Sequence, residues 1–256
     1  KLDALEDWAL SLNRRKILSY LDLRVRSAGL IAGKRLEGLL DHYFGDLCIE
    51  DLDHPYIAIA SDLLTGHEVW LRKGSLVEAM RASFALPGVF PPVEKNDRLL
   101  VDGALVNPVP IAPAQALGAR MTIGVDLNAD ILGKAAKPGQ HYHTVTGFDM
   151  FDENDVSAED QKRLTSGFSK RLFTRKENNP SLFGVMVSAL SIMQDRLTRS
   201  RLAGDPPDIH IKPRIGHIGL LEFEKADELI ALGEEAGEKA IPKIKDAMQV
   251  FLGLPG

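Results

Sequence analysis

The stretch RLLVDGALVNPVPIAPAQALGARMTIGVDLN, from Arg98 to Asn128, decides the fold. Its apolar run Leu99–Val101 predicts a strand that ends at Asp102-Gly103. Residues Pro110–Leu117 predict a helix, and Met121–Leu127 predict a second strand. Strand, helix and strand in this order are typical of a parallel sheet with crossover helices. We therefore expect an α/β fold with a central, mostly parallel sheet.

The rest of the chain supplies further elements of the same kinds. Ser75 and Glu78 form a capping-box pattern at the start of a helix that should end before Pro87. From Ala129 to Pro180 the chain is polar and strongly charged, which predicts a polar insertion or mobile loop region. Further strands are predicted at Tyr56–Ala60 and Glu68–Arg72, which should pair, and at Asp208–Lys212. Further helices are predicted at Lys1–Leu12, Leu36–Tyr43, Ser181–Leu202 (the longest), Glu224–Glu234 and Lys239–Phe251.

Size, charge and cysteine content limit the class of protein. The 256 residues, 45% of them hydrophobic, are enough for one domain spanning 1–256. A formal net charge of −5 gives no general attraction to nucleic acid or to an anionic bilayer. Cys48 is the only cysteine, which excludes an intrachain disulfide and favours a reducing compartment. No apolar stretch reaches the length of a spanning helix. We expect a soluble, cytoplasmic protein that can bind membranes peripherally.

Three short motifs carry a family resemblance. They are Arg81-Ala82-Ser83, the block Pro87-Gly88-Val89-Phe90-Pro91, and Asp102-Gly103-Ala104. In this order they resemble the bacterial patatin-like phospholipases, which are related to plant patatin and to the catalytic domain of neuropathy target esterase. The segments Ile59–Gly66 and Pro206–Ile209 also resemble that family, so the similarity covers nearly the whole chain.

The resemblance implies a three-layer patatin-like fold and a lipid acyl hydrolase that uses a Ser-Asp dyad. Asp102 of the Asp-Gly-Ala motif would be the general base, at the carboxyl end of a strand where open α/β sheets gather their sites. Gly103 would allow an unusual backbone angle and close approach of the substrate. Without the flanking motifs, Asp102-Gly103 would be interpreted as an ordinary turn.

The family also requires a Gly-rich oxyanion loop and a Gly-x-Ser-x-Gly nucleophile elbow, and neither motif occurs in this sequence. We therefore expect the nucleophilic serine and the oxyanion loop upstream of Lys1. The domain would be N-terminally incomplete, lacking a strand–loop–strand–helix portion, and this chain alone would be inactive. Ser61 and Ser83 lack the flanking glycines of an elbow and are interpreted as structural. The alternative is a catalytically inactive lipid-binding or regulatory module of the same fold.

The remaining candidate residues surround Asp102 in the sequence. Motif and cleft support is expected from Gly103, Ala104, Arg81, Ser83, Pro87 and Gly88, and contact with an acyl chain from Phe84, Leu86, Val89 and Phe90. Arg81 could also pair with a carboxylate. His141-Tyr142-His143 is too weak a pattern for a metal site, so no metal or cofactor is expected. The expected partner is a lipid ester or phospholipid at a membrane surface, without nucleic acid, and the oligomeric state stays open.

Overall fold

A computed structural model describes residues 2–13, 16, 33–129, 182–219 and 222–253. The chain divides into two compact units. The first contains Lys1–Ser19, Leu127–Asp195 and Lys212–Ala236, and the second contains Tyr20–Asp126, Arg196–Ile211 and Gly237–Gly256. The predicted polar insertion, from residue 130 onward, lies outside the described residues, as do His141 and His143.

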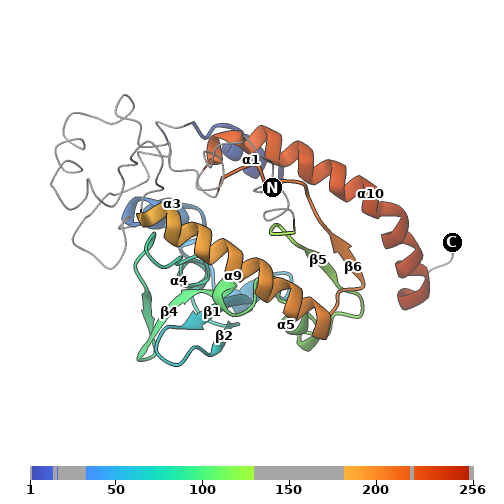
Figure 1. Cartoon of the computed structure of the whole chain (residues 1–256). Coiled ribbons are helices and arrows are strands. Elements are labelled where there is room, and N and C mark those ends of the chain that lie inside the picture. The colour runs from blue at the N-terminus through green and yellow to red at the C-terminus, as the bar shows by residue number, and fades with distance from the viewer. Residues whose placement is uncertain (1, 14–15, 17–32, 130–181, 220–221, 254–256) are drawn as a thin grey trace. The chain divides into compact units, whose positions relative to one another are not determined.

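The second unit contains a four-stranded sheet in the order β2-β1-β4-β3 (Figure 1). The strands are β1 (Ala58–Asp62), β2 (Glu68–Leu71), β3 (Val93–Lys95) and β4 (Arg98–Asp102). All three neighbouring pairs are antiparallel, and β4 is aligned on β1 so that Asp102 faces Ala60. The predicted pairing of Tyr56–Ala60 with Glu68–Arg72 is confirmed, with Gly66 in the connecting turn at φ 69°. The prediction that the strand ending at Asp102 belongs to a parallel sheet is wrong for the described strands.

A hairpin that the sequence analysis did not predict explains this difference. Asn96 and Asp97 both have positive φ, at 50° and 57°, and they form a two-residue turn between β3 and β4. Positive φ at both central residues is the geometry that matches the right-handed twist of paired antiparallel strands. This turn returns the chain directly beside β3, so β4 is antiparallel to its neighbour.

The second predicted strand of the decisive stretch lies in a separate, parallel pair. Strand β5 (Ile123–Val125) pairs with β6 (Ile209–Ile211), with Ile123 opposite Ile209. Before the pair begins, the Asp208 carboxylate accepts from the backbone N–H and the hydroxyl of Thr122, at 2.7 and 2.8 Å. These bonds fix the register of β5 and β6, and this pair is the parallel component of the described fold.

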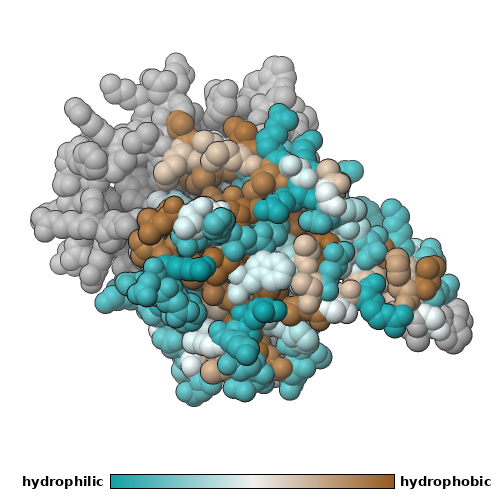
Figure 2. All heavy atoms as spheres, turned by 90° about the horizontal axis from the view of Figure 1, so that it is seen from below, coloured by the Kyte–Doolittle hydropathy of each residue, from teal (hydrophilic) through white to brown (hydrophobic). Residues whose placement is uncertain are grey.

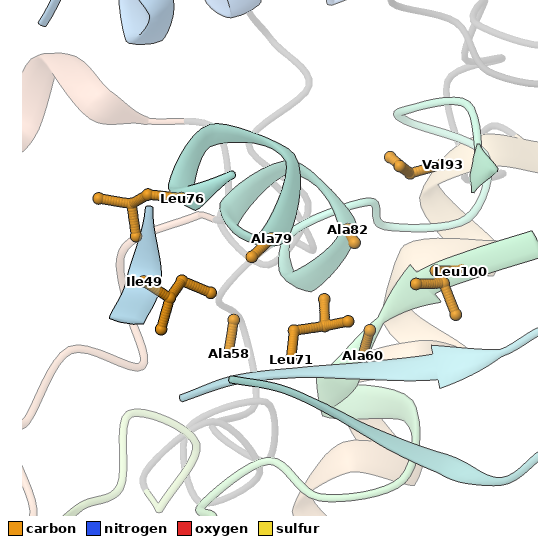
Figure 3. Packing of buried hydrophobic residues seen from close by; sticks show 9 residues of the cluster. All are labelled: Ile49, Ala58, Ala60, Leu71, Leu76, Ala79, Ala82, Val93 and Leu100. Atoms are coloured by element: carbon orange, nitrogen blue, oxygen red, sulfur yellow. The ribbon is translucent and has the colours of Figure 1, made fainter. Parts of the chain in front are cut away.

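The core of the second unit lies between the four-stranded sheet and helix α4 (Leu76–Ser83), as Figure 3 shows. Ala79 and Ala82 point from α4 toward the sheet, and their small side chains let the helix backbone approach it closely. The Ser75 half of the predicted capping box is confirmed, because the Ser75 hydroxyl accepts from the Glu78 N–H at 3.2 Å. The Glu78 carboxylate pairs with Lys95 of β3 and so ties the helix start to the sheet. The cluster comprises Ile49, Ala58, Ala60, Leu71, Leu76, Ala79, Ala82, Val93 and Leu100.

Helices account for most of the remaining described residues. They are α1 (Leu2–Leu10), α3 (Lys34–Phe44), α5 (Ile111–Ala116), α9 (Leu182–Gly204) and α10 (Ala226–Leu252), with short 3₁₀ turns η1 (Ile49–Asp51), η2 (Gly103–Leu105) and η4 (Phe223–Lys225). The two helices predicted after residue 224 form the single helix α10, so that prediction is wrong. Gly237 lies between the predicted helices, and one glycine costs a helix only about 1 kcal/mol relative to alanine. With 27 residues α10 exceeds the 23 of α9, which was expected to be the longest.

The surface mixes polar and apolar side chains. Figure 2 shows hydrophobic side chains interspersed among hydrophilic ones on the face that it presents. The most exposed apolar residues include Leu64 at the β1–β2 turn and Val250 in α10, at 76% and 79% of full exposure. Among the described helices, none is both long enough and apolar enough to cross a bilayer.

Candidate active site

Asp102 ends β4 and directly precedes the turn η2. Three hydrogen bonds fix it, two through its backbone and one through its carboxylate. Its N–H donates to the carbonyl of Ala85 at 3.0 Å, just after helix α4. Its carbonyl accepts from the Ser61 hydroxyl of β1 at 2.8 Å. Its side-chain Oδ1 accepts from the Ala104 N–H at 2.8 Å, as an N-cap does. The carboxylate is therefore fixed at the tip of a strand.

The electrostatic environment of Asp102 favours the protonated acid more than water does. Burial raises the pKa of the carboxyl above its ordinary value, and the Ala104 N–H offsets part of that rise. Among the described residues, no cation contributes to the pKa of Asp102. A half-buried carboxylate with a raised pKa is a stronger base than an exposed one, and such groups concentrate at functional sites.

Gly103 is required here by a close approach of two backbones. A Cβ atom on this residue would lie 2.2 Å from the carbonyl oxygen of Ile59 in β1. Its φ is not in the left-handed region, so the unusual backbone angle expected at this position is not found. The absence of a side chain at Gly103 thus lets η2, and the adjacent Asp102, pack closely against β1.

Ser61 is a structural residue, as expected. Its side chain is 2% exposed, and its hydroxyl is used in the bond to the Asp102 carbonyl. The sequence analysis did not assign it that partner. The alignment of β1 with β4 puts Ser61 opposite Val101, one residue before Asp102.

The two residues after η2, Val106 and Asn107, are held by a group of polar side chains that we call the Glu68 network (Glu68, Trp70, Asn107 and Arg201). Glu68 Oε1 accepts from Asn107 Nδ2 at 3.0 Å and from Trp70 Nε1 at 2.7 Å. Arg201 Nη2 lies 3.6 Å from Glu68 Oε2, and Arg201 Nε donates to the carbonyl of Val106 at 3.0 Å. The sequence analysis missed all four residues, because they come from three segments that only the fold brings together.

The predicted support residues lie on helix α4 and the loop after it. Arg81 forms an ion pair with Glu37 of α3, as its expected pairing with a carboxylate required. Ser83 is the last residue of α4, and this helix contacts both β4 and η2. Gly88 has φ 84°, which an L side chain rarely adopts, so Pro87-Gly88 turns the chain between α4 and β3.

The four predicted acyl-chain contacts separate into two groups. Phe84 and Phe90 are half-buried and stack edge to face, with ring centroids 5.4 Å apart. Together with Gly33, Arg81, Pro91 and Val93 they line a small pocket. Leu86 and Val89 are buried, at 8% and 2% exposure, and do not line it. Phe84 and Phe90 are therefore the pair that a ligand could reach.

Metal ligation finds no support in the described part of the chain. No group of three or more His, Cys, Asp or Glu side chains there is arranged to hold an ion. His210 Nε2 lies 3.4 Å from the buried Asp126 carboxylate at the end of the β5–β6 pair, which makes a pair and not a ligand set.

Comparison with known proteins identifies the family. The family model described as patatin-like phospholipase matches residues 1–114. An uncharacterised NTE family protein of Mycobacterium tuberculosis (strain H37Rv) is 32% identical over 281 residues, which cover 94% of this chain and 78% of that protein. The chain belongs to the patatin-like phospholipase family. All three motifs from which the resemblance was inferred fall within the matched 114 residues.

Other patatin-like relatives match the chain over a smaller share of their own length. A second NTE family protein of Mycobacterium tuberculosis is 27% identical over 89% of this chain but only 36% of its own length. Patatin-like phospholipase domain-containing protein 7 of Mus musculus is 33% identical over 113 residues, which cover 43% of this chain and 8% of that protein. The same module thus occurs in proteins of very different size.

Proposed function

We propose that the protein is a lipid acyl hydrolase, acting as a phospholipase, lysophospholipase or esterase, with Asp102 as the general base. The observation that carries this proposal is the environment of the Asp102 carboxylate, in a chain that belongs to the patatin-like phospholipase family. The carboxylate is half-buried at the tip of β4, and its pKa is raised by burial. Among the described residues, only the Ala104 N–H donates to its side chain, and it does so at Oδ1. A base of this kind accepts a proton from a serine hydroxyl more readily than an ordinary aspartate does.

In the proposed reaction, the serine of the Ser-Asp dyad attacks the acyl carbonyl of the lipid ester. Asp102 takes the hydroxyl proton as the Oγ–C bond forms, and the proton passes to the departing alcohol as the ester bond breaks. Water then attacks the acyl carbonyl while Asp102 accepts one of its protons, and that proton passes to the serine oxygen as the Oγ–acyl bond breaks and the fatty acid leaves. In this proposal the serine belongs to a nucleophile elbow and the oxyanion donors to a Gly-rich loop, two motifs that this sequence does not contain.

The aromatic pair supports the assignment of a lipid substrate. Phe84 directly precedes Ala85, whose carbonyl accepts the Asp102 N–H, and Phe90 follows in the same loop and packs on Phe84. Pockets for acyl groups are lined mainly by apolar and aromatic side chains with few polar groups. We propose that these two rings contact the acyl chain, whereas the buried Leu86 and Val89 support them from the core.

The test is Asp102→Asn in the full-length protein. Asparagine keeps an oxygen that can accept from the Ala104 N–H but cannot take a proton from serine, so ester hydrolysis should fall by on the order of a thousandfold or more. Hydrolysis of a p-nitrophenyl fatty acid ester and of a phospholipid measures this directly. Activity that survives the substitution removes Asp102 from the mechanism.

The alternative is a catalytically inactive lipid-binding or regulatory module, and the lack of a nucleophile-elbow motif in this sequence favours it. A fluorophosphonate probe separates the two functions, because it labels an activated serine covalently. One labelled serine per full-length protein supports the hydrolase. Lipid binding without any labelling supports the module.

A further inference from the structure

The turn that follows Asp102 sets the direction of its side chain, and this turn is held at its far end by a network outside the motif. Asp102 Oδ1 accepts from the N–H of Ala104, so the carboxylate can keep its orientation only while η2 keeps its shape. Just after η2, the N–H groups of Val106 and Asn107 both donate to the carbonyl of Gly103, the first residue of η2, at 3.0 and 2.8 Å. A shift of Val106 or Asn107 therefore moves Gly103 and Ala104 as well.

The Glu68 network holds these two residues. Arg201 Nε donates to the Val106 carbonyl, and Asn107 Nδ2 donates to Glu68 Oε1. Glu68 lies on β2, which pairs with β1, and β1 is the strand against which Gly103 packs. The network thus connects the end of η2 to the same sheet that carries Asp102.

Burial makes these contacts stronger than surface contacts of the same type. Asn107 is 7% exposed and the Glu68 side chain 18%. A buried amide that loses its acceptor costs more stability than a broken ion pair at the surface, because water cannot replace the buried partner. Arg201 is 42% exposed, so its main role is the bond to the Val106 carbonyl and not the attraction at 3.6 Å.

We infer that the Glu68 network positions the Asp102 carboxylate for proton transfer, by fixing η2 against the sheet. Glu68, Asn107 and Arg201 are positioning residues and touch no substrate in this scheme. The inference rests on the proposed function for its catalytic consequence. Its structural part is that Glu68 maintains the hydrogen bond from the Ala104 N–H to Asp102. This part can be measured without an assay of enzyme activity.

The first measurement is amide hydrogen exchange in the full-length protein. In Glu68→Ala, the Ala104 amide should exchange about tenfold faster or more, because η2 is released at its far end. Glu68→Gln keeps an oxygen that accepts from Asn107 and should retain most of the protection. Thr122→Ala is the matched control, because it removes two buried hydrogen bonds in the same unit, to and from Asp208, without touching η2. Unchanged exchange at Ala104 in Glu68→Ala overturns the inference.

The second measurement is the pH dependence of kcat and kcat/KM. Loss of the Ala104 N–H raises the pKa of Asp102, since that bond lowers it, so the acidic limb of the Glu68→Ala profile should move to higher pH. We expect kcat to fall by on the order of tenfold to a hundredfold with little change in KM. A loss of folded protein alone would lower kcat without moving the limb, as expected for Thr122→Ala.

The outcomes separate the two proposals. If the wild-type protein neither hydrolyses esters nor reacts with the fluorophosphonate, the proposed function fails, and hydrogen exchange at Ala104 still decides whether the network holds η2. If the wild-type protein is active but the acidic limb of Glu68→Ala stays in place, the catalytic role of the network is overturned. Glu68→Gln provides the same tests if Glu68→Ala does not fold.

Discussion

Burial at Asp102 increases the basicity of the carboxylate and at the same time costs stability. A carboxyl whose pKa is raised in the folded state binds its proton more tightly there than in the unfolded chain. Its contribution to stability is therefore greatest below the unfolded pKa, near 3.8, and is lost as the pH rises through the folded pKa. We predict that Asp102→Asn, which removes this charge and retains the cap on Ala104, unfolds at a higher temperature than the wild-type protein at pH 7.

Asp208 provides a control, because the pKa of its carboxyl is shifted in the direction opposite to that of Asp102. The backbone N–H and the hydroxyl of Thr122 lower the pKa of its carboxyl, so its stabilisation is present above 3.8 and is lost as the pH falls through the lower folded value. Asp208→Asn should therefore lower the melting temperature at pH 7. Thermal unfolding of both variants at pH 7 and pH 3 checks the signs. A lower melting temperature for Asp102→Asn at pH 7 would contradict the burial argument.

Phe90 is the residue at which the proposed lipid substrate can be tested without changing Asp102. Its ring is half-buried and lines the pocket with Phe84, so a charged side chain can turn toward solvent there. Phe90→Asp should leave the protein folded but raise KM for long-chain esters by on the order of tenfold, and change short-chain esters little. Steady-state kinetics with butyrate and palmitate esters provide the comparison. An unchanged preference for chain length counts against acyl contact at this pocket.

At the level of elements, the junction of β4 with η2 is the least tolerant part of the fold. We predict that Gly103→Ala destabilises the protein by about 3 kcal/mol, because its Cβ would collide with the Ile59 carbonyl oxygen and force the strands apart. Gly38→Ala is the matched control, since Gly38 lies inside helix α3 with no atom near the added methyl, and it should stabilise by about 0.5 to 1 kcal/mol. Urea unfolding measures both, and equal effects would refute the steric argument.

The same junction shows what sequence patterns can and cannot predict. The run Leu99–Val101 correctly indicated a strand ending at Asp102, and Ser75 correctly indicated a helix start, because both signals are local. The partner of β4 was not predictable from these signals, since apolar runs do not encode strand direction. Asn96-Asp97 was the local signal that could have revealed the β3–β4 hairpin.

The supporting contacts of the site depended on contacts between distant segments. Asp102 and Arg81 could both be proposed from short motifs, because each motif lies within one segment of the sequence. Glu68 and Arg201 are separated by more than a hundred residues and meet only after β2 and α9 have been placed beside η2. No periodicity or turn signal connects them, so a single sequence gave no basis for predicting their contact.

For the whole molecule, the family model and the alignment with a mycobacterial relative cover different shares of the chain. The family model ends at residue 114, in helix α5, whereas the mycobacterial relative aligns with 94% of the chain. That alignment therefore reaches well beyond α5, into the region that holds the β5–β6 pair. The sequence similarity therefore continues beyond the recognised motifs, through the residues that form the parallel β5–β6 pair.

The net charge of the whole chain leads to a prediction about membrane binding. Basic side chains near an anionic leaflet gain about 1 kcal/mol each, but this chain carries 31 Lys and Arg against 36 Asp and Glu. We therefore expect the protein to bind vesicles of phosphatidylcholine as well as vesicles containing phosphatidylglycerol. Raising the salt concentration to about 0.5 M should not weaken binding, because apolar contacts are not screened. Co-sedimentation with both vesicle types measures this, and strong, salt-sensitive binding to the anionic vesicles alone would show that a local basic surface outweighs the net charge.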